Sequence, residues 1–456
     1  MTTDDFLRGF PGDGFAPGGK VQIYYTGVRK RMRTYSLILA LVLITSYARA
    51  VYDPAVMVHL ALAGRDSSGY ANTVSVSWST TNSTQTSTVK YGTVSGEYAS
   101  TSTGSQASYW ETFHHHVVLD ALEPGATYFY RAGDDEAGWS EEFSFASPTH
   151  VAPSSTSSAD DSFSFAVYGD LGIHLGGPTI SRLDKWASRG EIDLVWHGGD
   201  VGYADDSFVH KDCVFKFCYE SVYDEYMNAV ESWTSKIPYM TLPGNHEADC
   251  HDPACLADAA KREKLSNFTT FNTRFRMPAP ESGATALNMH YSFNYKNVHF
   301  ISMDSETGYP GATEETRYVL PCGGFWQDQL EWLEQDLIQA NKDRGERPWI
   351  LAQAHRPLYQ GSSVNKRYQD AVEGLFKKYK VDVYFSGHVH WYERNYPVYD
   401  SQVPSTDPET AYVNPVDTTY VMVGGAGNDE MRKTMLSPIF KDPSPRLIID
   451  NSEAGP

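Results

Sequence analysis

Five short polar clusters between residues 170 and 390 carry the side-chain types that bind metal ions. Each cluster follows an apolar segment with the composition of a β-strand. The candidate ligands are Asp170, Asp200, Tyr203, Asn245, His355, His388 and His390. Carboxylates and a phenolate suit a hard cation of the Fe(III) type, whereas imidazoles and an amide suit a borderline divalent cation. The combination therefore predicts a site for two metal ions.

A pair of metal ions would suit the hydrolysis of phosphate esters. Such esters are anionic and repel a nucleophile, and two adjacent cations can neutralise them, generate hydroxide and hold the leaving oxygen. One carboxylate must bridge the pair. Each cluster taken alone could be a turn or a surface histidine. His388 and His390, however, point the same way on an extended segment, because side chains alternate along a strand.

The elements that must position these clusters are strands and helices of an α/β domain. The predicted strands cover residues 163–168, 194–196, 239–242, 298–303, 349–352 and 381–385. Residues 325–340 are predicted as an amphipathic helix, with Leu330, Leu333 and Leu337 on one face. The carboxyl ends of strands form the ligand crevice of open α/β sheets, so we expect the clusters to converge there.

A different pattern precedes this domain. Residues 57 to about 148 alternate apolar and polar side chains, with short strands separated by Gly, Ser and Asn, which predicts a small β-sandwich. His114, His115 and His116 could bind a metal, but they open one of these strands, which favours a structural role. A stretch rich in Ser, Thr, Asp and Ala, residues 151–161, is predicted as a linker.

The beginning of the chain predicts export. The order of segments there is that of a secretory signal peptide. It consists of a basic stretch at residues 29–33, an apolar run at 35–47 and the sequence Ala48-Arg49-Ala50. The expected location is therefore extracellular or vacuolar, with no stable membrane insertion after cleavage. The glycosylation sequons at Asn82 and Asn267 agree with a secreted glycoprotein.

The cysteines also suit an exported protein. Cys213 and Cys218 are close neighbours, as are Cys250 and Cys255, and each pair could close a small loop by a disulfide. Cys322 is left over. A structural zinc site is disfavoured because the two-residue spacing between cysteines is missing.

The formal net charge of −20 disfavours nucleic acid as a partner. Any phosphate site must then carry its own positive charge. A metal cluster would supply that charge, and a patch of Lys and Arg would not be needed.

The clusters occur along the chain in the order Gly169-Asp170, Gly199-Asp200-Val201-Gly202-Tyr203, Gly244-Asn245-His246, Ala352-Gln353-Ala354-His355 and Gly387-His388-Val389-His390. In this order they resemble the motifs of the purple acid phosphatases, a family of binuclear metallophosphoesterases. The resemblance covers about residues 57 to 430. It implies a fibronectin-III-like β-sandwich followed by a metallophosphoesterase α/β sandwich with mixed sheets. The implied boundaries are 1–50 for the signal peptide and upstream extension, 51–150 for the β-sandwich, 151–161 for the linker, 162–430 for the catalytic domain and 431–456 for an atypical tail.

The resemblance also implies a role for each site residue. Asp170, Tyr203 and His390 would hold Fe(III), and Asn245, His355 and His388 would hold a second metal, Fe(II), Zn(II) or Mn(II). Asp200 would bridge the two ions. His246 would stay outside the ligand set and hydrogen-bond the phosphate or help protonate the leaving group.

The implied activity is an acid phosphatase that hydrolyses phosphate monoesters by in-line attack of a metal-bound hydroxide. Two alternatives stay open: a nucleotide pyrophosphatase or phosphodiesterase on the same scaffold, and a non-catalytic cell-surface binding protein. The general acid is also open between His246, a water molecule and none, since no histidine lies between His355 and His388. A homodimer is a further open expectation.

Overall fold

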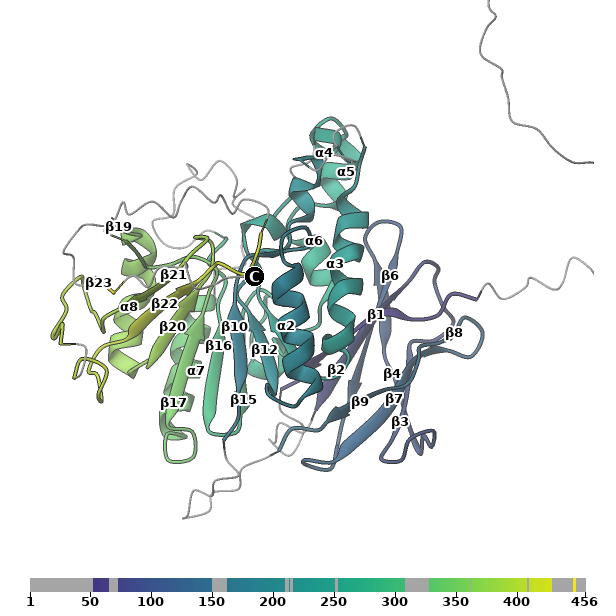
Figure 1. The fold of residues 1–456 in the computed structure, drawn as a ribbon, viewed down its shortest axis with the longest axis horizontal. Coiled ribbons are helices and arrows are strands. Elements are labelled where there is room, and N and C mark those ends of the chain that lie inside the picture. The colour runs from purple at the N-terminus through teal and green to yellow at the C-terminus, as the bar shows by residue number, and fades with distance from the viewer. Residues whose placement is uncertain are drawn as a thin grey trace, which may run out of the picture. The chain divides into compact units, whose positions relative to one another are not determined.

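The computed structural model describes residues 52–64, 73–149, 162–209, 213, 216–250, 253–307, 328–361, 363–407, 410–428 and 446–447. These residues belong to one compact unit, Val51–Pro456 (Figure 1). The predicted signal peptide, the linker, Cys322 and most of the predicted C-terminal tail lie outside the described residues.

The first part of this unit is an antiparallel β-sandwich (Figure 1). Its four-stranded sheet has the order β1 (Val56–Leu62), β2 (Val74–Thr80), β6 (Phe113–Leu119) and β5 (Ser105–Ser108). Its second sheet has the order β4 (Ser100–Thr103), β3 (Thr88–Gly92), β7 (Thr127–Asp134) and β8 (Gly138–Trp139), with β9 (Phe143–Ala146) paired to β7. Inward-facing Val76, Trp78, Val117 and Tyr130 form a core between the two sheets, as alternation along the strands requires.

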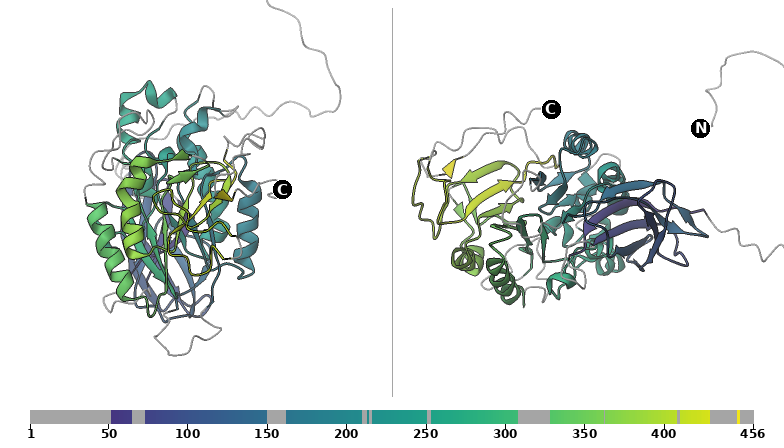
Figure 2. Two further views of the ribbon diagram at one scale, coloured as in Figure 1. Left: turned by 90° about the vertical axis from the view of Figure 1, so that its left-hand side faces the viewer. Right: turned by 90° about the horizontal axis from the view of Figure 1, so that it is seen from below.

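The second part contains two further sheets. A parallel three-stranded sheet consists of β10 (Phe165–Tyr168), β12 (Leu194–His197) and β14 (Tyr239–Thr241). A mixed seven-stranded sheet has the order β15 (Tyr291–Tyr295), β16 (Val298–Ser302), β17 (Trp349–Gln353), β20 (Val383–Ser386), β22 (Thr419–Val423), β21 (Tyr392–Asn395) and β23 (Arg446–Leu447). Helices α2 (Gly177–Ser188) and α3 (Tyr219–Thr234) lie beside the smaller sheet, and α7 (Gln329–Lys342) and α8 (Lys366–Tyr379) lie along the larger one (Figure 2).

Short elements complete the unit. They are β11 (Leu171–Gly172), β13 (Val201–Gly202), η2 (Ala204–Val209), η3 (Asn245–Glu247), α4 (Pro253–Leu256), α5 (Ala259–Lys264), α6 (Thr269–Arg274), η4 (Pro280–Ser282), β18 (Tyr359–Gln360) and β19 (Ser363–Val364). No helix within the described ranges has both the length and the apolar character that crossing a bilayer requires.

Trp196 of β12 joins the two sheets of the second part. Its ring is fully buried and meets Phe300 of β16 at 5.0 Å and Phe385 of β20 at 6.0 Å between centroids, edge to face in both cases. Its indole N–H donates to the Ser302 hydroxyl at 2.9 Å. This contact fixes the spacing of the sheets, because a large ring with a satisfied polar edge contributes both buried area and orientation.

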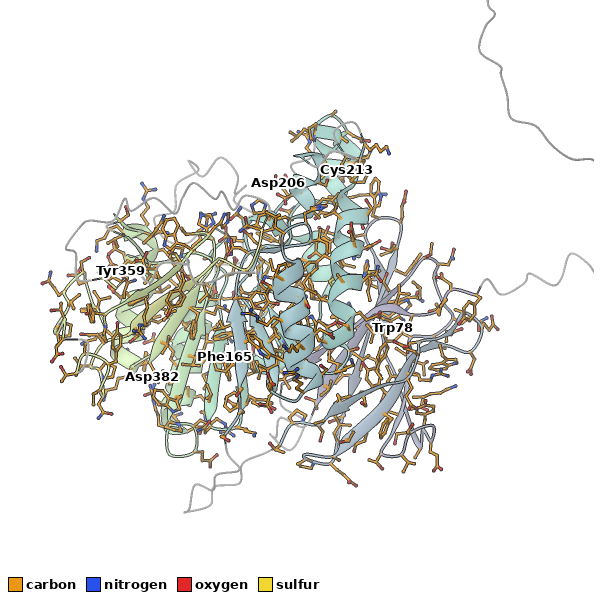
Figure 3. All side chains as sticks on the ribbon, viewed as in Figure 1. Trp78, Phe165, Asp206, Cys213, Tyr359 and Asp382 are labelled. Atoms are coloured by element: carbon orange, nitrogen blue, oxygen red, sulfur yellow. A yellow bond between two sulfur atoms is a disulfide. The ribbon has the colours of Figure 1, made fainter. Side chains whose placement is uncertain are left out.

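Helix α3 connects the sandwich to the sheets of the second part. The Thr234 hydroxyl donates to the Val58 carbonyl at 3.1 Å, and the Val58 N–H donates to Glu231 at 2.7 Å. The Tyr130 hydroxyl of β7 reaches the Ser235 carbonyl at 2.8 Å. The crowded side chains throughout both parts are drawn in Figure 3, where Trp78 marks the sandwich core and Phe165 the second part.

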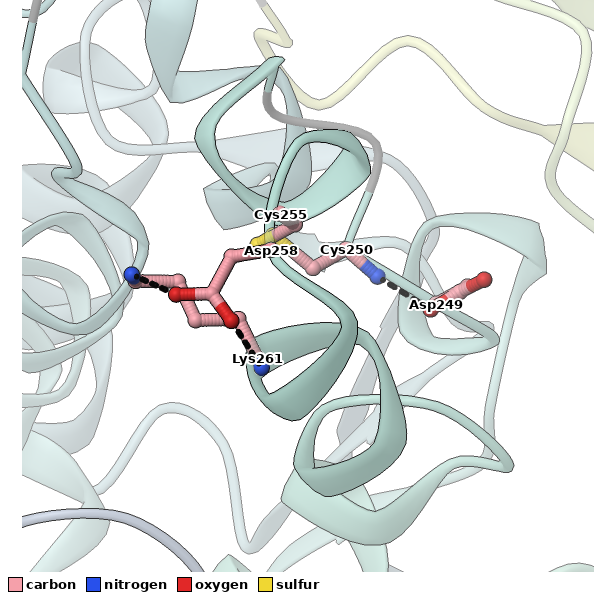
Figure 4. Close-up of a disulfide and its surroundings, with 5 residues drawn as sticks. All are labelled: Asp249, Cys250, Cys255, Asp258 and Lys261. Atoms are coloured by element: carbon pink, nitrogen blue, oxygen red, sulfur yellow. Dashed lines mark hydrogen bonds and ion pairs between the residues drawn. A yellow bond between two sulfur atoms is a disulfide. The ribbon is translucent and has the colours of Figure 1, made fainter.

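Two disulfides, Cys213–Cys218 and Cys250–Cys255, confirm the expected pairing of neighbouring cysteines. The second lies beside α5 (Figure 4), whose N-cap residue Asp258 accepts from the Ala260 and Lys261 N–H groups. A capping carboxylate stabilises a short helix by satisfying its first N–H groups.

The predicted fold class, a β-sandwich followed by an α/β sandwich with mixed sheets, is confirmed. All six predicted strands are present, with ends shifted by up to two residues. The helix expected at 325–340 instead runs from Gln329 to Lys342 within the described residues, since Asp328 precedes its first turn. The strands that carry the clusters belong to two stacked sheets, and not to one open sheet.

Candidate metal centre

The predicted ligands lie at the carboxyl ends of parallel strands from both sheets. Asp170 follows β10, Asp200 follows β12 and Asn245 follows β14, all in the smaller sheet. His355 follows β17, while His388 and His390 follow β20, in the larger sheet. The short parallel pair β11 and β13 joins the first two loops, with Leu171 opposite Val201. The stacking of the sheets therefore brings loops from five strands to one place.

Four of these seven residues have a left-handed backbone. The φ angles are 66° at Asp170, 56° at Asp200, 54° at Tyr203 and 66° at His388. This conformation costs a non-glycine residue roughly 1 kcal/mol or more. Such strain persists only where the surrounding structure enforces it, and here it re-aims each side chain into the cluster.

The Tyr203 hydroxyl is the centre of the first group of side chains. It lies 3.1 Å from Asp170 Oδ1, 3.2 Å from Asp200 Oδ2 and 3.2 Å from His390 Nε2. His390 Nε2 is also 3.2 Å from Asp170 Oδ1. Two carboxylates and one imidazole thus converge within hydrogen-bond distance of the phenol oxygen.

His355 is the centre of the second group. Its Nε2 atom lies 3.1 Å from Asp200 Oδ2 and 3.1 Å from Asn245 Oδ1. Its Nδ1 atom lies 2.9 Å from the Gly198 carbonyl, to which Nδ1–H donates, so Nε2 is the nitrogen that faces the cluster and could bind a metal ion. Potential ligand atoms of Asp200, His355 and His388 all lie within 4.8 Å of one another. Asp200 Oδ2 therefore touches both groups, which is the position a bridging ligand needs.

The electrostatics favour a cation between these groups. Burial alone would lower the pKa of His355, but the Asp200 and Asp170 carboxylates outweigh burial and raise its pKa to about 10. Burial would likewise raise the pKa of Asp200, yet the charges of His355 and His246 hold this pKa well below its usual value. Buried carboxylates that draw positive charge this strongly provide the electrostatic condition for metal binding.

Two glycines leave the space that the carboxylates occupy. A Cβ atom at Gly387 would lie 2.5 Å from Asp170 Oδ2, and a Cβ atom at Gly244 would collide with the Asp200 carboxylate. The glycines beside the clusters therefore allow the backbone to approach the acidic side chains closely. Together with the hard oxygen donors around Tyr203 and the imidazoles around Asp200, this cradle fits a pair of metal ions.

His246 stands beside the cluster and is held by an aspartate that sequence reasoning missed. Its Nδ1 atom lies 2.9 Å from both Asp205 oxygens, and its Nε2 atom lies 3.9 Å from Asp200 Oδ2. Its backbone N–H donates to Asp200 Oδ1 at 3.0 Å. The neighbouring Asp206, labelled in Figure 3, lies 3.8 Å from the ring. The carboxylate of Asp205 orients the imidazole, and its position two residues after Tyr203 was the available signal.

Glu247 was also missed. Its buried carboxylate accepts the backbone N–H groups of Asp200 at 2.9 Å, Val201 at 2.7 Å and Gly244 at 2.7 Å. It therefore ties the loop after β12 to the loop after β14 and holds the strained backbone of Asp200. A charged residue directly after Asn245 and His246, in a buried strand-end cluster, was its signal in the sequence.

The three histidines of the sandwich take no part in this centre. His115 stacks on Trp78 at 4.9 Å and bonds Thr80 and Ser87, while His116 bonds Ser77 and the Thr273 carbonyl. These contacts give the run a structural role.

Comparison with known proteins agrees with both parts of the fold. The profile of the purple acid phosphatase N-terminal domain matches residues 56–147, and the profile of the calcineurin-like phosphoesterases matches residues 163–392. Acid phosphatase type 7 of Danio rerio is 32% identical over 390 residues, which cover 79% of this chain and 76% of that protein. An acid phosphatase of Aspergillus ficuum is 31% identical over 419 residues, covering 70% and 67% of the two chains.

A probable purple acid phosphatase of Arabidopsis thaliana is 30% identical over 405 residues, which cover 86% of this chain and 78% of that protein. Among solved structures, the purple acid phosphatase of yellow lupin seeds superposes with a TM-score of 0.60 at 22% identity, covering 82% of this chain. The match spans 65% of the lupin chain. The order of the strand-end clusters, the two stacked sheets and these likenesses together show that the chain belongs to the purple acid phosphatase family.

Proposed function

We propose that this protein is an acid phosphatase that hydrolyses phosphate monoesters at a binuclear metal centre. The observation that carries this proposal is the convergence on Asp200 Oδ2, which lies 3.2 Å from the Tyr203 hydroxyl and 3.1 Å from His355 Nε2. The relatives named acid phosphatase and purple acid phosphatase support the same activity. A pair of cations bound there would supply Lewis-acid activation of water and would neutralise the phosphate.

The proposed ligands divide into the two groups that meet at Asp200. Asp170, Tyr203 and His390 hold the harder ion, proposed as Fe(III), and Asn245, His355 and His388 hold a divalent ion, proposed as Fe, Zn or Mn. The donors around Tyr203 are oxygens with one imidazole, and those around His355 are imidazoles with one amide, which supports this division.

The chain's own residues then orient the groups and move a proton. Glu247 fixes the Asp200 backbone, so the bridging carboxylate keeps its place through the reaction. The Asp205 carboxylate holds His246 Nδ1 at 2.9 Å, which leaves Nε2 facing the cluster. From there the imidazole can donate a hydrogen bond to a phosphate oxygen or a proton to the leaving oxygen. His246 is therefore the proposed general acid.

Export and glycosylation are part of the same proposal. Both sequon residues, Asn82 and Asn267, are exposed, as glycosylation requires. The two disulfides support an oxidising compartment, because such bonds are rare in reducing ones. Secretion or delivery to a vacuole through the N-terminal signal, and the assembly of a homodimer, complete the proposal.

Hydrolysis of p-nitrophenyl phosphate and of its bis-ester by the purified protein tests the activity. We expect faster turnover of the monoester at acidic pH, and an Asp200→Asn variant with at least about a hundredfold lower kcat, since the bridging charge is lost. Preferential cleavage of the bis-ester would instead support the phosphodiesterase alternative. Failure to cleave either ester, in protein that contains metal, would support the non-catalytic alternative.

A further inference from the structure

We propose that Arg356 binds the phosphate group of the substrate and that Glu306 holds the guanidinium in place for this contact. The proposal rests on the proposed phosphatase function and adds a residue that selects monoesters over diesters. Arg356 directly follows the proposed ligand His355, and Glu306 lies just beyond the end of β16, a strand that carries none of the predicted ligands.

The two side chains form a multidentate pair. Arg356 Nε lies 3.0 Å from Oε1 and 2.9 Å from Oε2 of Glu306, and Nη2 lies 2.8 Å from Oε2. The Glu306 side chain is fully buried, and its Oε1 atom accepts from the Ser305 hydroxyl at 2.9 Å. A planar guanidinium bonded along one edge by a buried carboxylate has its orientation fixed. The third guanidinium nitrogen, Nη1, is not part of this bonded edge.

Nη1 lies at the metal centre. It is 3.3 Å from His388 Nε2, and His388 belongs to the proposed ligand set. The backbone of Arg356 is fixed as well, because its N–H donates to Ser305 Oγ at 2.9 Å and its carbonyl accepts from the Tyr384 hydroxyl at 2.7 Å. The Arg356 side chain is 15% exposed, so part of it reaches solvent. Its position beside the cluster is therefore preformed.

Phosphate is the chemistry that this arrangement recognises. The guanidinium N–H groups match phosphate oxygens in direction, and pairing with Glu306 offsets the charge of Arg356, so recognition depends on this direction more than on a general attraction for anions. A phosphate monoester has three non-bridging oxygens and a diester has two. An additional N–H donor beside a metal pair therefore favours the monoester, which has one more oxygen to offer. The sequence predicted that a patch of Lys and Arg would not be needed, and one arginine paired with a buried glutamate is not such a patch.

The test compares three variants, Arg356→Gln, Arg356→Lys and Glu306→Gln, with a matched control, Arg367→Gln, on the exposed surface of α8. The full-length protein of each variant is analysed for bound metal, for the affinity of inorganic phosphate by calorimetry, and for KM and kcat on the monoester and bis-ester of p-nitrophenol. Metal content and phosphate affinity are independent of turnover.

We expect Arg356→Gln to retain its metal and to weaken phosphate binding, with KM for the monoester rising by the same factor. A charged hydrogen bond of ordinary strength corresponds to about a ten- to hundredfold change. The kcat/KM value for the bis-ester should change less than about threefold. Arg356→Lys should be intermediate because it keeps the charge without the planar fork. Glu306→Gln should weaken phosphate binding in part, and the control should match the parent.

Two results would overturn the proposal. The first is an unchanged phosphate affinity in metal-loaded Arg356→Gln. The second is loss of metal from this variant, which would make Arg356 a residue that positions His388 and not one that binds substrate. If Arg356→Gln gives either result and the parent protein still cleaves the monoester, the proposed function stands. A metal-loaded parent that neither cleaves the monoester nor binds phosphate removes the proposed function itself.

Discussion

Acid should weaken the fold through His59, a buried histidine on β1 that packs against α6 and its C-cap residue Phe275. The ring is 4% exposed, its Nδ1 atom lies 2.9 Å from the Met57 carbonyl, and its centroid lies 5.4 Å from that of Phe275. Burial and the nearby Arg274 charge lower the pKa of His59 from 6.5 to about 4, and hydrogen bonds to backbone groups only partly oppose this shift. The neutral ring is therefore the form that the folded protein holds.

The sign and size of the effect follow from linkage. Between the folded pKa of about 4 and the unfolded value of 6.5, the unfolded chain binds a proton that the folded chain does not. The free energy of unfolding therefore falls as the pH falls through this window, and at pH 7 the contribution is absent. The difference of about 2.5 pKa units corresponds to about 3.4 kcal/mol when complete, and to about 2 kcal/mol at pH 5.

Denaturant unfolding followed by tryptophan fluorescence, at pH 7 and at pH 5, measures this contribution. A His59→Asn variant keeps a donor for the Met57 carbonyl but cannot titrate. Its loss of stability between the two pH values should be smaller than that of the parent by about 2 kcal/mol. The exposed His174 provides the control, since His174→Asn should leave the pH dependence unaltered. The same pH dependence in parent and His59→Asn would show that His59 does not contribute to the loss of stability in acid.

Three further predictions concern the site and the sheets. Gly387→Ala should place a Cβ atom 2.5 Å from Asp170 Oδ2 and displace this carboxylate, so we expect about a hundredfold lower kcat together with less bound metal, and unchanged metal content would contradict this. Asp205→Asn should release the imidazole that it orients and lower kcat about ten- to hundredfold with metal retained, as single-turnover kinetics and metal analysis can establish. Trp196→Phe should lower the free energy of unfolding by about 2 kcal/mol through lost packing between the sheets, whereas Trp349→Phe, at a side chain that is 51% exposed, should change it by less than about 0.5 kcal/mol.

Much of the candidate site was predictable because strand ends and polar residue types are both visible in a sequence. Asp170, Asp200 and Asn245 each lie two to four residues after the end of a strand, so their convergence needed only the rule that parallel strands end at one edge. The presence of two stacked sheets was not visible in that rule. It depends on contacts such as that of Trp196 with Phe300, which join residues more than a hundred positions apart.

The supporting residues were harder to predict. Glu247 stabilises Asp200 through backbone N–H groups, which have no signature in side-chain spacing. Glu306 and Arg356 are 50 residues apart, and neither type is unusual at the end of a strand. Burial of His59 depends on packing between the sandwich and α6, which alternation along one strand cannot reveal. Sequence patterns thus predict the donors, while the residues that hold the donors in place require the tertiary structure.

The measurement that tests the central claim most directly is the metal content and visible spectrum of the purified protein beside its Tyr203→Phe variant. We expect two metal ions per chain, one of them iron, and a broad visible band in the parent from charge transfer between the Tyr203 phenolate and iron. The band should be absent from the variant. A protein that binds fewer than two ions, or a band that persists unchanged without the phenol, would contradict the claim that these seven side chains hold a binuclear centre.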